Sequence, residues 1–257
     1  MNNVPVRTVS DAKRDFYAHH TRPINSIYRR VVDELMVEMH LLSVNVDFAY
    51  DPIYALGIVT TFDRFMAGYQ PEADRTSIFN ALCRSIGSTP EHYRGDAEAI
   101  QASVNGLSLD DLKALFDPLA DGGGDGGDRL RSTLATVAHQ EKFKYSRPFG
   151  IGLYTLVEAV TPAEALKDKE TVAALFNDLG NKLFISTDKL QKDVELYRGN
   201  LEKFAQAQEV IKDMLAADRK KREDRKKAAE AEVEALAQPV VAVPEAGETS
   251  ETSETTD

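Results

Sequence analysis

The chain has little of what several classes of protein need. It contains one cysteine, Cys83, among 257 residues, so no disulfide can form within the chain, as is usual for proteins of a reducing compartment. No run of 18 or more apolar residues occurs, and a helix needs about that length to cross a bilayer. Alternating apolar and polar residues, the pattern of half-buried strands, are scarce. These absences favour a mostly helical protein without a membrane-spanning segment of its own.

The start of the chain and its charge argue against further classes. The first residues, MNNVPVRTVSD, contain no apolar signal core and no long presequence rich in Arg and Ser, so we expect a protein made where it works. The net charge is −11, and residues 1–216 carry 24 basic and 31 acidic side chains. A nucleic-acid-binding protein needs basic surface that neutralises phosphates. We therefore expect no nucleic-acid partner.

Residues 22–48 show the strongest periodicity in the chain. Apolar side chains recur there at steps of three or four residues, which places one per turn on a single face of an α-helix. Arg29, Asp33 and Glu38 fall on the opposite face. We therefore predict a core helix on which the other helices pack. Its predicted buried face consists of Ile24, Tyr28, Val31, Leu35, Met39, Leu42 and Val46.

Capping residues predict where further helices begin and end. Asp51 followed by Pro52 starts a helix that ends at Gly68, because Asp supplies a cap oxygen and Pro suits the first turn. Thr161 and Glu164 have the spacing of a capping box for a later helix, and Gly180 is a plausible helix end. The other predicted helices begin at Ser10, Pro71, Thr89, Ser108 and Phe143 and end near His20, Ile86, Asn105, Phe116 and Val160.

From Thr187 the apolar spacing alternates between four and three residues, which is typical of a coiled coil. Two interpretations stay open: this heptad seam packs within its own chain, or its distal part binds another protein. After Leu215 the apolar stripe stops although helix formers continue, and a helix over 188–236 would be about 73 Å long. The heptad seam consists of Leu190, Val194, Tyr197, Leu201, Phe204, Gln208, Ile211 and Leu215.

These patterns predict an all-α fold: a compact multi-helix body, a long protruding C-terminal helix and a disordered acidic tail. The body spans 9–216 after a disordered start at 1–8, and the glycines of DGGGDGGD at 121–128 make a flexible loop within it. The protruding charged helix covers 217–236. The tail at 237–257 has five acids and no base, a composition typical of disorder.

Signals of catalysis are weak. The segment GIGLYT at 150–155 lacks the third glycine and the preceding strand of a dinucleotide site. No H-E-x-x-H occurs, and no Glu lies three residues before a histidine, which removes the zinc-protease and di-iron signatures. The acids of DGGGDGGD only faintly resemble a calcium loop, and a linker explains them better. We predict no catalytic residue, no metal and no cofactor, and an unrecognised hydrolase is the remaining enzymatic alternative.

Single reactive side chains have a structural interpretation. Cys83 lies in the apolar run IFNALC and is predicted to be a buried small hydrophobe rather than a nucleophile. His19 and His20 are adjacent and diverge on a helix, so we expect them on the surface or partly packed. His40 is expected at the edge of the core face.

Two features are candidates for interactions. The basic run RKKREDRKK at 219–227 is either a solvated helix with opposite-charge pairs or a contact for anionic lipid or an acidic partner. In the second interpretation the contact residues are Lys220, Lys221, Arg222, Arg225, Lys226 and Lys227. A polar and aromatic corner at 45–54 and 63–72 is explained by capping and packing or by partner binding, for which Tyr and Arg are common anchors. Its candidate residues are Asp47, Tyr50, Arg64 and Tyr69.

Four long stretches carry a family likeness. They are VSDAKRDFYAHHTRPINSIYRRVVDELMVEMHLLSVNVDFAYDPIYALGIVTTFDRFMAGYQPE, SIFNALC, FKYSRPFGIGLYTLVE and LQKDVELYRGNLEKFAQAQEVIKDMLAADRKKRE. Together they resemble the thylakoid formation family, whose members are described as photosystem II accessory factors of cyanobacteria and plastids. The resemblance covers roughly residues 9–225. The chain departs from the family pattern at 121–128 and at the tail. It also departs at Pro148 and Gly150, where the family pattern favours a helix more strongly.

The resemblance implies an all-helical, non-enzymatic protein of photosynthetic membrane biogenesis and of photosystem II assembly and repair. It also implies association with the FtsH protease complex and with photosystem II components. The missing presequence points to a cyanobacterial member held peripherally on the cytoplasmic side of the thylakoid membrane, and we expect a monomer. The alternative function is a self-associating coiled-coil structural protein at the membrane surface.

Overall fold

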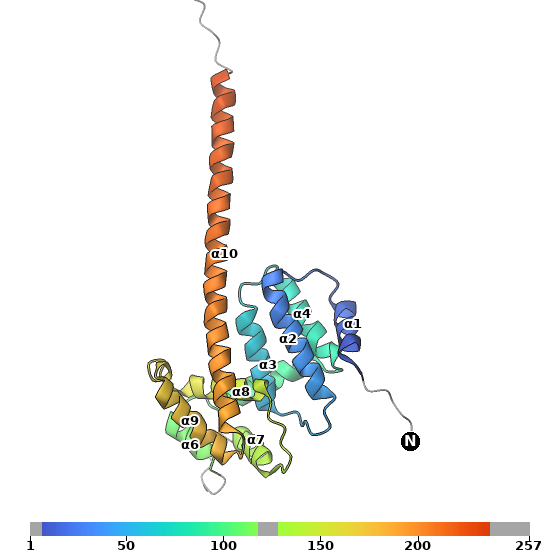
Figure 1. Cartoon of the computed structure of the whole chain (residues 1–257), viewed down its shortest axis with the longest axis vertical. Coiled ribbons are helices and arrows are strands. Elements are labelled where there is room, and N and C mark those ends of the chain that lie inside the picture. Colours follow the sequence, from blue (N-terminus) through green and yellow to red (C-terminus); the bar gives the residue numbers. More distant parts are fainter. Residues whose placement is uncertain (1–6, 118–127, 237–257) are drawn as a thin grey trace, which may run out of the picture. The chain divides into compact units, whose positions relative to one another are not determined.

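The computed structural model of the chain describes residues 7–117 and 128–236, and the described residues contain helices but no strand (Figure 1). The predicted all-α fold is therefore confirmed. The chain divides into two units, Met1–Phe204 and Ala205–Asp257, earlier than residue 216, where the body was predicted to end. The helices are α1 (Val9–His19), α2 (Ser26–Ser43), α3 (Pro52–Phe65), α4 (Glu72–Ser85), α5 (Pro90–Ala102), α6 (Leu109–Leu115), α7 (Asp128–His139), α8 (Arg147–Val160), the 3₁₀ turn η1 (Ala165–Lys167), α9 (Lys169–Lys182) and α10 (Thr187–Leu236).

Local capping chemistry sets most of the helix starts. The side chains of Asp51, Thr89 and Ser108 each accept a hydrogen bond from the backbone amide three residues later, which satisfies one of the free N–H groups of a first turn. These three predicted starts are confirmed. Gly68 and Gly87 follow α3 and α4 with φ of 78° and 79°, a conformation that glycine adopts without a steric penalty.

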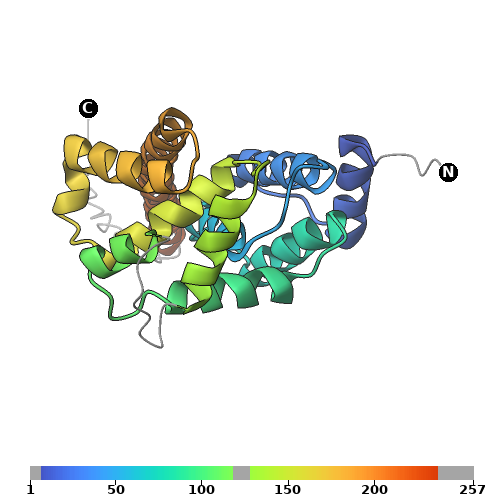
Figure 2. The ribbon, with the colours of Figure 1, turned by 90° about the horizontal axis from the view of Figure 1, so that it is seen from below.

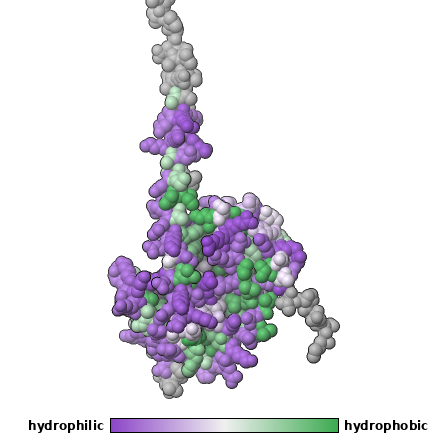
Figure 3. Space-filling model, viewed as in Figure 1, coloured by the Kyte–Doolittle hydropathy of each residue, from purple (hydrophilic) through white to green (hydrophobic). Residues whose placement is uncertain are grey.

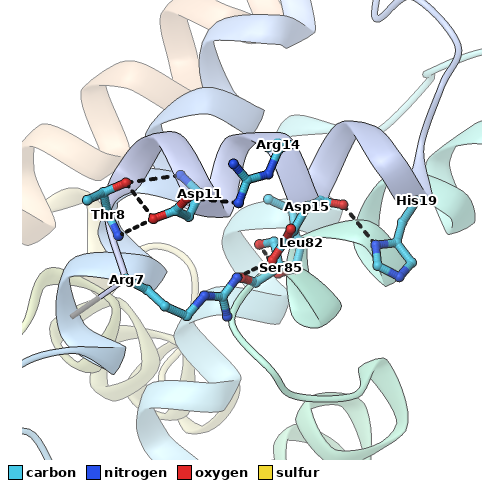
Figure 4. A network of polar contacts seen from close by, with 8 residues as sticks. All are labelled: Arg7, Thr8, Asp11, Arg14, Asp15, His19, Leu82 and Ser85. Atoms are coloured by element: carbon cyan, nitrogen blue, oxygen red, sulfur yellow. Dashed lines mark hydrogen bonds and ion pairs between the residues drawn. The ribbon is translucent and has the colours of Figure 1, made fainter. Parts of the chain in front are cut away.

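Helix α1 begins earlier than predicted, and its start is fixed by polar contacts with α4 (Figure 4). Thr8, not Ser10, is the N-cap and forms a capping box with Asp11. The Arg7 guanidinium pairs with Asp15 and donates to the Ser85 carbonyl over 3.0 Å. Residues 1–6 of the predicted disordered start, the loop at 121–127 and the tail at 237–257 lie outside the described residues.

Helix α2 is shorter at both ends than the predicted helix at 22–48. Asn25 caps it, and it ends at Ser43, because Pro23 precedes the cap and the chain turns at Val44. Val46 lies beyond this end and is 97% exposed, so its predicted burial is wrong. The rest of the predicted face is at least partly buried: Tyr28, Leu35, Met39 and Leu42 are buried, and Ile24 and Val31 are half-buried.

The capping box predicted at Thr161 is also wrong. Thr161 follows the end of α8, a 3₁₀ turn intervenes, and α9 is capped by Asp168, whose carboxylate accepts from the amide of Thr171. Gly180 does not end α9 but is buried within it. The left-handed residue after this helix is Phe184, with φ of 55°.

Helices α3 and α8 cross in backbone contact at the centre of the first unit. A Cβ atom on Gly57 would lie 1.7 Å from the Pro148 carbonyl oxygen, and one on Gly152 would lie 2.0 Å from the Ile53 carbonyl oxygen. Both glycines are therefore required by the close approach of the two helices. Pro148 occupies the first turn of α8 and Ser146 caps it, so the helix begins at Arg147 rather than at the predicted Phe143.

Apolar side chains of the first unit form two clusters, and α3 contributes residues to both. Figure 2 shows the ribbon of the helices that carry them. One contains Phe16, Met36 and Phe79 from the first four helices, and the other contains residues of α5 to α10 such as Phe149 and Phe176. Phe204 on α10 packs against both clusters, with ring contacts to Tyr28 and Phe65 at 5.6 and 5.5 Å. These packed faces hold the helices of the first unit together.

The described side chains of the second unit belong to α10. From Ala205 to Ala228 each described side chain is exposed except that of Gln208, which is half-buried. This stretch is mostly hydrophilic in Figure 3, with a smaller hydrophobic area. The 50 residues of α10 make a helix about 75 Å long, so the predicted long C-terminal helix is confirmed.

Candidate functional site

The polar and aromatic corner does not form one site. The hydroxyl of Tyr50 donates to an Asp96 carboxylate oxygen over 3.0 Å, and its ring stacks on His92. Burial raises the pKa of Tyr50, and the bond to Asp96 adds to the effect. Asp47 is exposed on the turn after α2. No hydrogen bond or ion pair between Asp47, Tyr50, Arg64 and Tyr69 occurs in the part of the chain that the structure describes.

Arg64 and Tyr69 are held by the body itself. Arg64 pairs with Glu158 of α8, and Glu158 also accepts from the hydroxyl of Tyr154 over 3.1 Å. Tyr69 is 3% exposed and meets Tyr28 edge-on at 4.9 Å. The ring of Tyr69 is therefore buried within the body. The capping and packing interpretation of this corner accounts for both side chains.

Asp51, the N-cap residue of α3, has a carboxylate that is desolvated by burial. Its carboxylate accepts from the Tyr54 amide over 2.9 Å at the start of α3. Burial raises the pKa of Asp51 to about 7, although hydrogen bonds from the amides of Tyr54 and Ile53 act in the opposite direction. The positive end of the helix dipole also opposes the rise. The cap is thus a titratable group near neutral pH.

A cluster around Asp63 was missed at the level of sequence. Asp63 on α3 accepts from Arg75 of α4 over 2.9 Å and from both terminal nitrogens of Arg94 of α5 over 3.0 and 3.1 Å. Arg94 also lies 4.4 Å from the centre of the Phe79 ring. The three charged residues come from three helices without a common spacing, so no local signal identified them. They join α3, α4 and α5, and Asp63 and Arg94 also line an open depression of about 650 Å³.

The reactive single residues are structural in their surroundings. Cys83 is fully buried, and burial raises the pKa of its thiol to about 12, as its predicted role of a small hydrophobe requires. His20 is 1% exposed and His40 is 2% exposed, so His20 is more buried than the surface or partly packed position expected for it. The Nδ1 atom of His20 lies 2.9 Å from the Ser77 hydroxyl. Among the described residues no group of three or more His, Cys, Asp or Glu side chains is placed to hold a metal ion.

The basic run at 219–227 lies on the exposed part of α10. Its six candidate contact residues are all exposed. Arg222 pairs with Asp218 over 3.0 Å and Arg219 pairs with Glu223 over the same distance, both one turn apart. Such pairs suit a solvated helix, and they leave the surface strongly basic. No described helix is long and apolar enough to cross a membrane.

An open groove of about 1280 Å³ lies between α2 and the first turns of α10, with the start of α8 at one side. We call it the α2–α10 groove. Val37 and Leu41 of α2 and Leu196 of α10 line it and are exposed. Glu38, predicted on the wet face of α2, is half-buried here. These residues fall outside the predicted apolar faces of both helices, so periodicity gave no reason to bring them together.

The fold and its surfaces define an all-helical protein whose candidate sites are open grooves and charged helix faces. The thylakoid formation protein family model matches residues 8–226 of the chain. The chain belongs to this family.

Relatives and a solved structure agree with the family match. The chain is 56% identical to protein Thf1 of Nostoc punctiforme over 239 residues, which cover 91% of this chain and 97% of that protein. It is 54% identical to protein Thf1 of Crocosphaera subtropica over 221 residues, 86% of this chain and 89% of the relative. The structure of Psb29 superposes with a TM-score of 0.71 at 39% identity, covering 84% of this chain and 98% of Psb29. The predicted resemblance is therefore confirmed.

Proposed function

We propose that this protein is a non-enzymatic accessory factor of thylakoid membrane biogenesis and of photosystem II assembly and repair. It acts as an adaptor that associates with the FtsH protease complex. The observation that carries the proposal is the family match over residues 8–226. The surfaces of the molecule support it, since an adaptor works through exposed faces such as the α2–α10 groove and the basic run of α10.

The basic run supplies the membrane contact in this proposal. Lys220, Lys221, Arg222, Arg225, Lys226 and Lys227 are exposed on α10. Each cation near an anionic lipid surface contributes about 1 kcal/mol of attraction, which salt weakens. The proposal places this peripheral contact on the cytoplasmic side of the thylakoid membrane, and the likeness to cyanobacterial relatives supports the thylakoid location.

A full-length variant with these six residues changed to Glu tests the membrane contact. We expect it to pellet less with isolated thylakoid membranes than the natural chain does, with an unchanged melting temperature because the six side chains are exposed. A matched control changes six exposed acids elsewhere on the body to Lys. Equal pelleting of the natural chain and the basic-run variant contradicts the membrane role of this segment.

The adaptor role is tested separately by affinity purification of the full chain from solubilised cyanobacterial thylakoids. We expect FtsH subunits and photosystem II subunits in the eluate at higher abundance than in a purification with an unrelated acidic helical protein. Their absence under mild detergent, with the bait intact, contradicts the proposal.

A self-associating coiled-coil protein is the second candidate, and one observation favours it. Val210, Ile211 and Met214 on α10 are 58%, 41% and 67% exposed, so part of the helix presents apolar side chains to water. A parallel or antiparallel pairing of two chains would cover them. Sedimentation velocity over a hundredfold concentration range decides the matter: a constant monomer mass excludes this candidate, and we expect that result.

A further inference from the structure

Exposed apolar side chains gather in the α2–α10 groove. Val37, Leu41 and Leu196 are 37%, 53% and 49% exposed and line the same depression. Val37 and Leu41 are one turn apart on α2, so they form a short stripe along the groove. Large aliphatic side chains that stay in water within one concave surface are a mark of an interaction site.

All but one of the acidic side chains that line the groove pair with a basic side chain of the same chain. Arg29 lies 3.9 Å from Asp33, Arg30 lies 2.8 Å from Glu34, and Arg147 lies 3.7 Å from Asp193. Asp193 also accepts from the Tyr145 hydroxyl over 3.0 Å.

Glu38 is the exception. It sits beside Val37 and Leu41, half-buried, and no Lys, Arg or His nitrogen of the described residues lies within 4 Å of its carboxylate. Burial raises the pKa of Glu38, Arg147 opposes the rise, and Asp193 and Glu34 add to it. A desolvated carboxylate without a cation is costly, and a cation supplied from outside would remove this cost.

The edge of the groove has the opposite character. Lys189 and Lys192 of α10 line it and are exposed, and in the described part of the chain no carboxylate lies within 4 Å of either nitrogen. A matching ligand thus has a cation between apolar groups at its centre and acids toward one edge.

We propose that the α2–α10 groove binds an amphipathic helix of a partner protein, whose apolar side chains cover Val37, Leu41 and Leu196 and whose Lys or Arg pairs with Glu38. This inference rests on the proposed adaptor function and names the kind of partner segment it takes. The groove walls are helices, which offer no free strand edge, so the partner packs by side chains along a helix face. The groove exceeds the about 300–1,000 Å³ of usual small-molecule sites. Four acidic and five basic side chains line it together, so it offers no uniformly basic surface for anionic lipid.

A photo-crosslinking residue at Leu41 in the full chain, expressed in cyanobacterial cells, tests which segment fills the groove. Mass spectrometry of the crosslinked peptides is expected to find a partner segment with apolar residues at steps of three and four and a Lys or Arg among them. The same crosslinker at Val46, 97% exposed but outside the groove, is expected not to capture it. Crosslinks at Leu41 only to lipid, crosslinks to another copy of this chain, or no crosslink overturn the proposal.

Glu38 variants provide a readout that a purely structural residue would not give. We expect Glu38→Gln to leave the melting temperature unchanged or raise it, because it removes a desolvated charge, and to weaken capture several-fold. Glu38→Lys is expected to lower capture by about tenfold or more, through like-charge repulsion. Glu91→Lys is the matched control, because Glu91 of α5 is exposed and does not line the groove, and it is expected to change capture less than threefold. Equal losses in the two Lys variants overturn the role of Glu38.

A charge swap makes the assignment specific. Changing the captured Lys or Arg of the partner to Glu is expected to restore capture by the Glu38→Lys variant, and failure to restore it overturns the pairing. The outcomes also separate this inference from the proposed function. If the full chain still purifies FtsH while Leu41 captures no helix, the groove inference fails alone. If Leu41 captures such a helix while the full chain purifies neither FtsH nor photosystem II subunits, the proposed function fails alone.

Discussion

The two parts of α10 share one apolar spacing as far as residue 215 but differ in what surrounds their side chains. In residues 187–204 the heptad seam is buried at Leu190, Val194 and Tyr197, and Phe204 is half-buried between two core clusters. In residues 205–228 the same spacing continues through Ile211, which is 41% exposed. The helix is continuous across both parts, so helical propensity does not separate them.

The comparison shows that an apolar period predicts a helix face but not what covers it. The first part of the seam is buried because α2, α3, α8 and α9 supply facing side chains, among them Tyr28 and Phe65. The second part has no such neighbours among the described residues of its own unit. Stability therefore depends on contacts within the body, whereas the exposed part of α10 is free to carry charge at little cost.

The largest expected effect is a loss of stability on disrupting the crossing of α3 and α8 at the centre of the first unit. Gly57→Ala would place a methyl group 1.7 Å from the Pro148 carbonyl oxygen, so α3 and α8 must separate. We expect a loss of about 3 kcal/mol or more in the free energy of unfolding, measured by urea denaturation. Gly199→Ala on α10, where a Cβ meets nothing within 4 Å, is the control and is expected to gain about 0.5–1 kcal/mol. Similar effects at both glycines would contradict the backbone contact.

Two substitutions along the seam sharpen the comparison directly. Phe204→Ala removes ring contacts with Tyr28 and Phe65, and we expect it to cost about 2–3 kcal/mol, less than a fully buried Phe because the ring is half-buried. Ile211→Ala removes an exposed side chain and should change the free energy of unfolding by less than about 0.5 kcal/mol. Thermal and urea unfolding of the two full-length variants provide the measurement. Equal costs would mean that Ile211 is buried by a partner chain in solution.

A smaller effect is expected from the ionisation of Asp51, which makes the free energy of unfolding depend on pH. The pKa of Asp51 is raised to about 7, above its unfolded value of about 3.9, so the folded state holds the proton more tightly. Its contribution to stability is therefore present at low pH and is lost as the pH rises through 7. Asn keeps the cap without titrating.

We accordingly expect Asp51→Asn to be more stable than the natural chain at pH 8 by about 1–2 kcal/mol and to lose that advantage at pH 5. Asp213→Asn, on the exposed part of α10, should show no such pH dependence. Urea denaturation of the three proteins at both pH values measures the difference. An Asp51 variant that is less stable at pH 8 would show that the ionised cap outweighs the cost of its burial.

The smallest expected effect is at a body residue that is as exposed as the distal part of α10. Phe184 is 82% exposed and has φ of 55°, a conformation that costs a side-chain-bearing residue about 1 kcal/mol. We expect Phe184→Gly to raise the free energy of unfolding by up to about 1 kcal/mol, whereas Phe184→Leu should give no gain. A destabilised Gly variant would mean that the ring contributes packing despite its exposure.

Local chemistry made much of the fold predictable. Asp51 with Pro52, and Ser108, set helix starts through side-chain oxygens within three residues, so the sequence contains the whole interaction. The start of α9 was mispredicted because Thr161 and Asp168 both suit a cap, and the 3₁₀ turn between them depends on the burial of Leu166. The family likeness was visible in long continuous stretches and needed no geometry.

The candidate site was less predictable, because it depends on residues that meet only in the fold. Val37 and Leu196 lie 159 positions apart in the chain and outside the predicted apolar faces, so each seemed an isolated surface residue. The sequence did not decide between packing and partner binding for Tyr69, because its burial depends on Tyr28, on another helix. Because Glu38 is charged, it was predicted to face water. Its surroundings are instead set by the residues of α8 and α10 that line the groove with it.

The crossing of α3 and α8 also has an evolutionary consequence. With Gly57 and Gly152 each facing the other helix's carbonyl oxygen, neither position can drift alone, since a methyl group on either one forces the same separation of both axes. A lineage that replaced one glycine would have to re-space the crossing by altering Ile53, Pro148 or their neighbours in concert. We therefore expect the two glycines to be kept or replaced together, although they are far apart in the sequence.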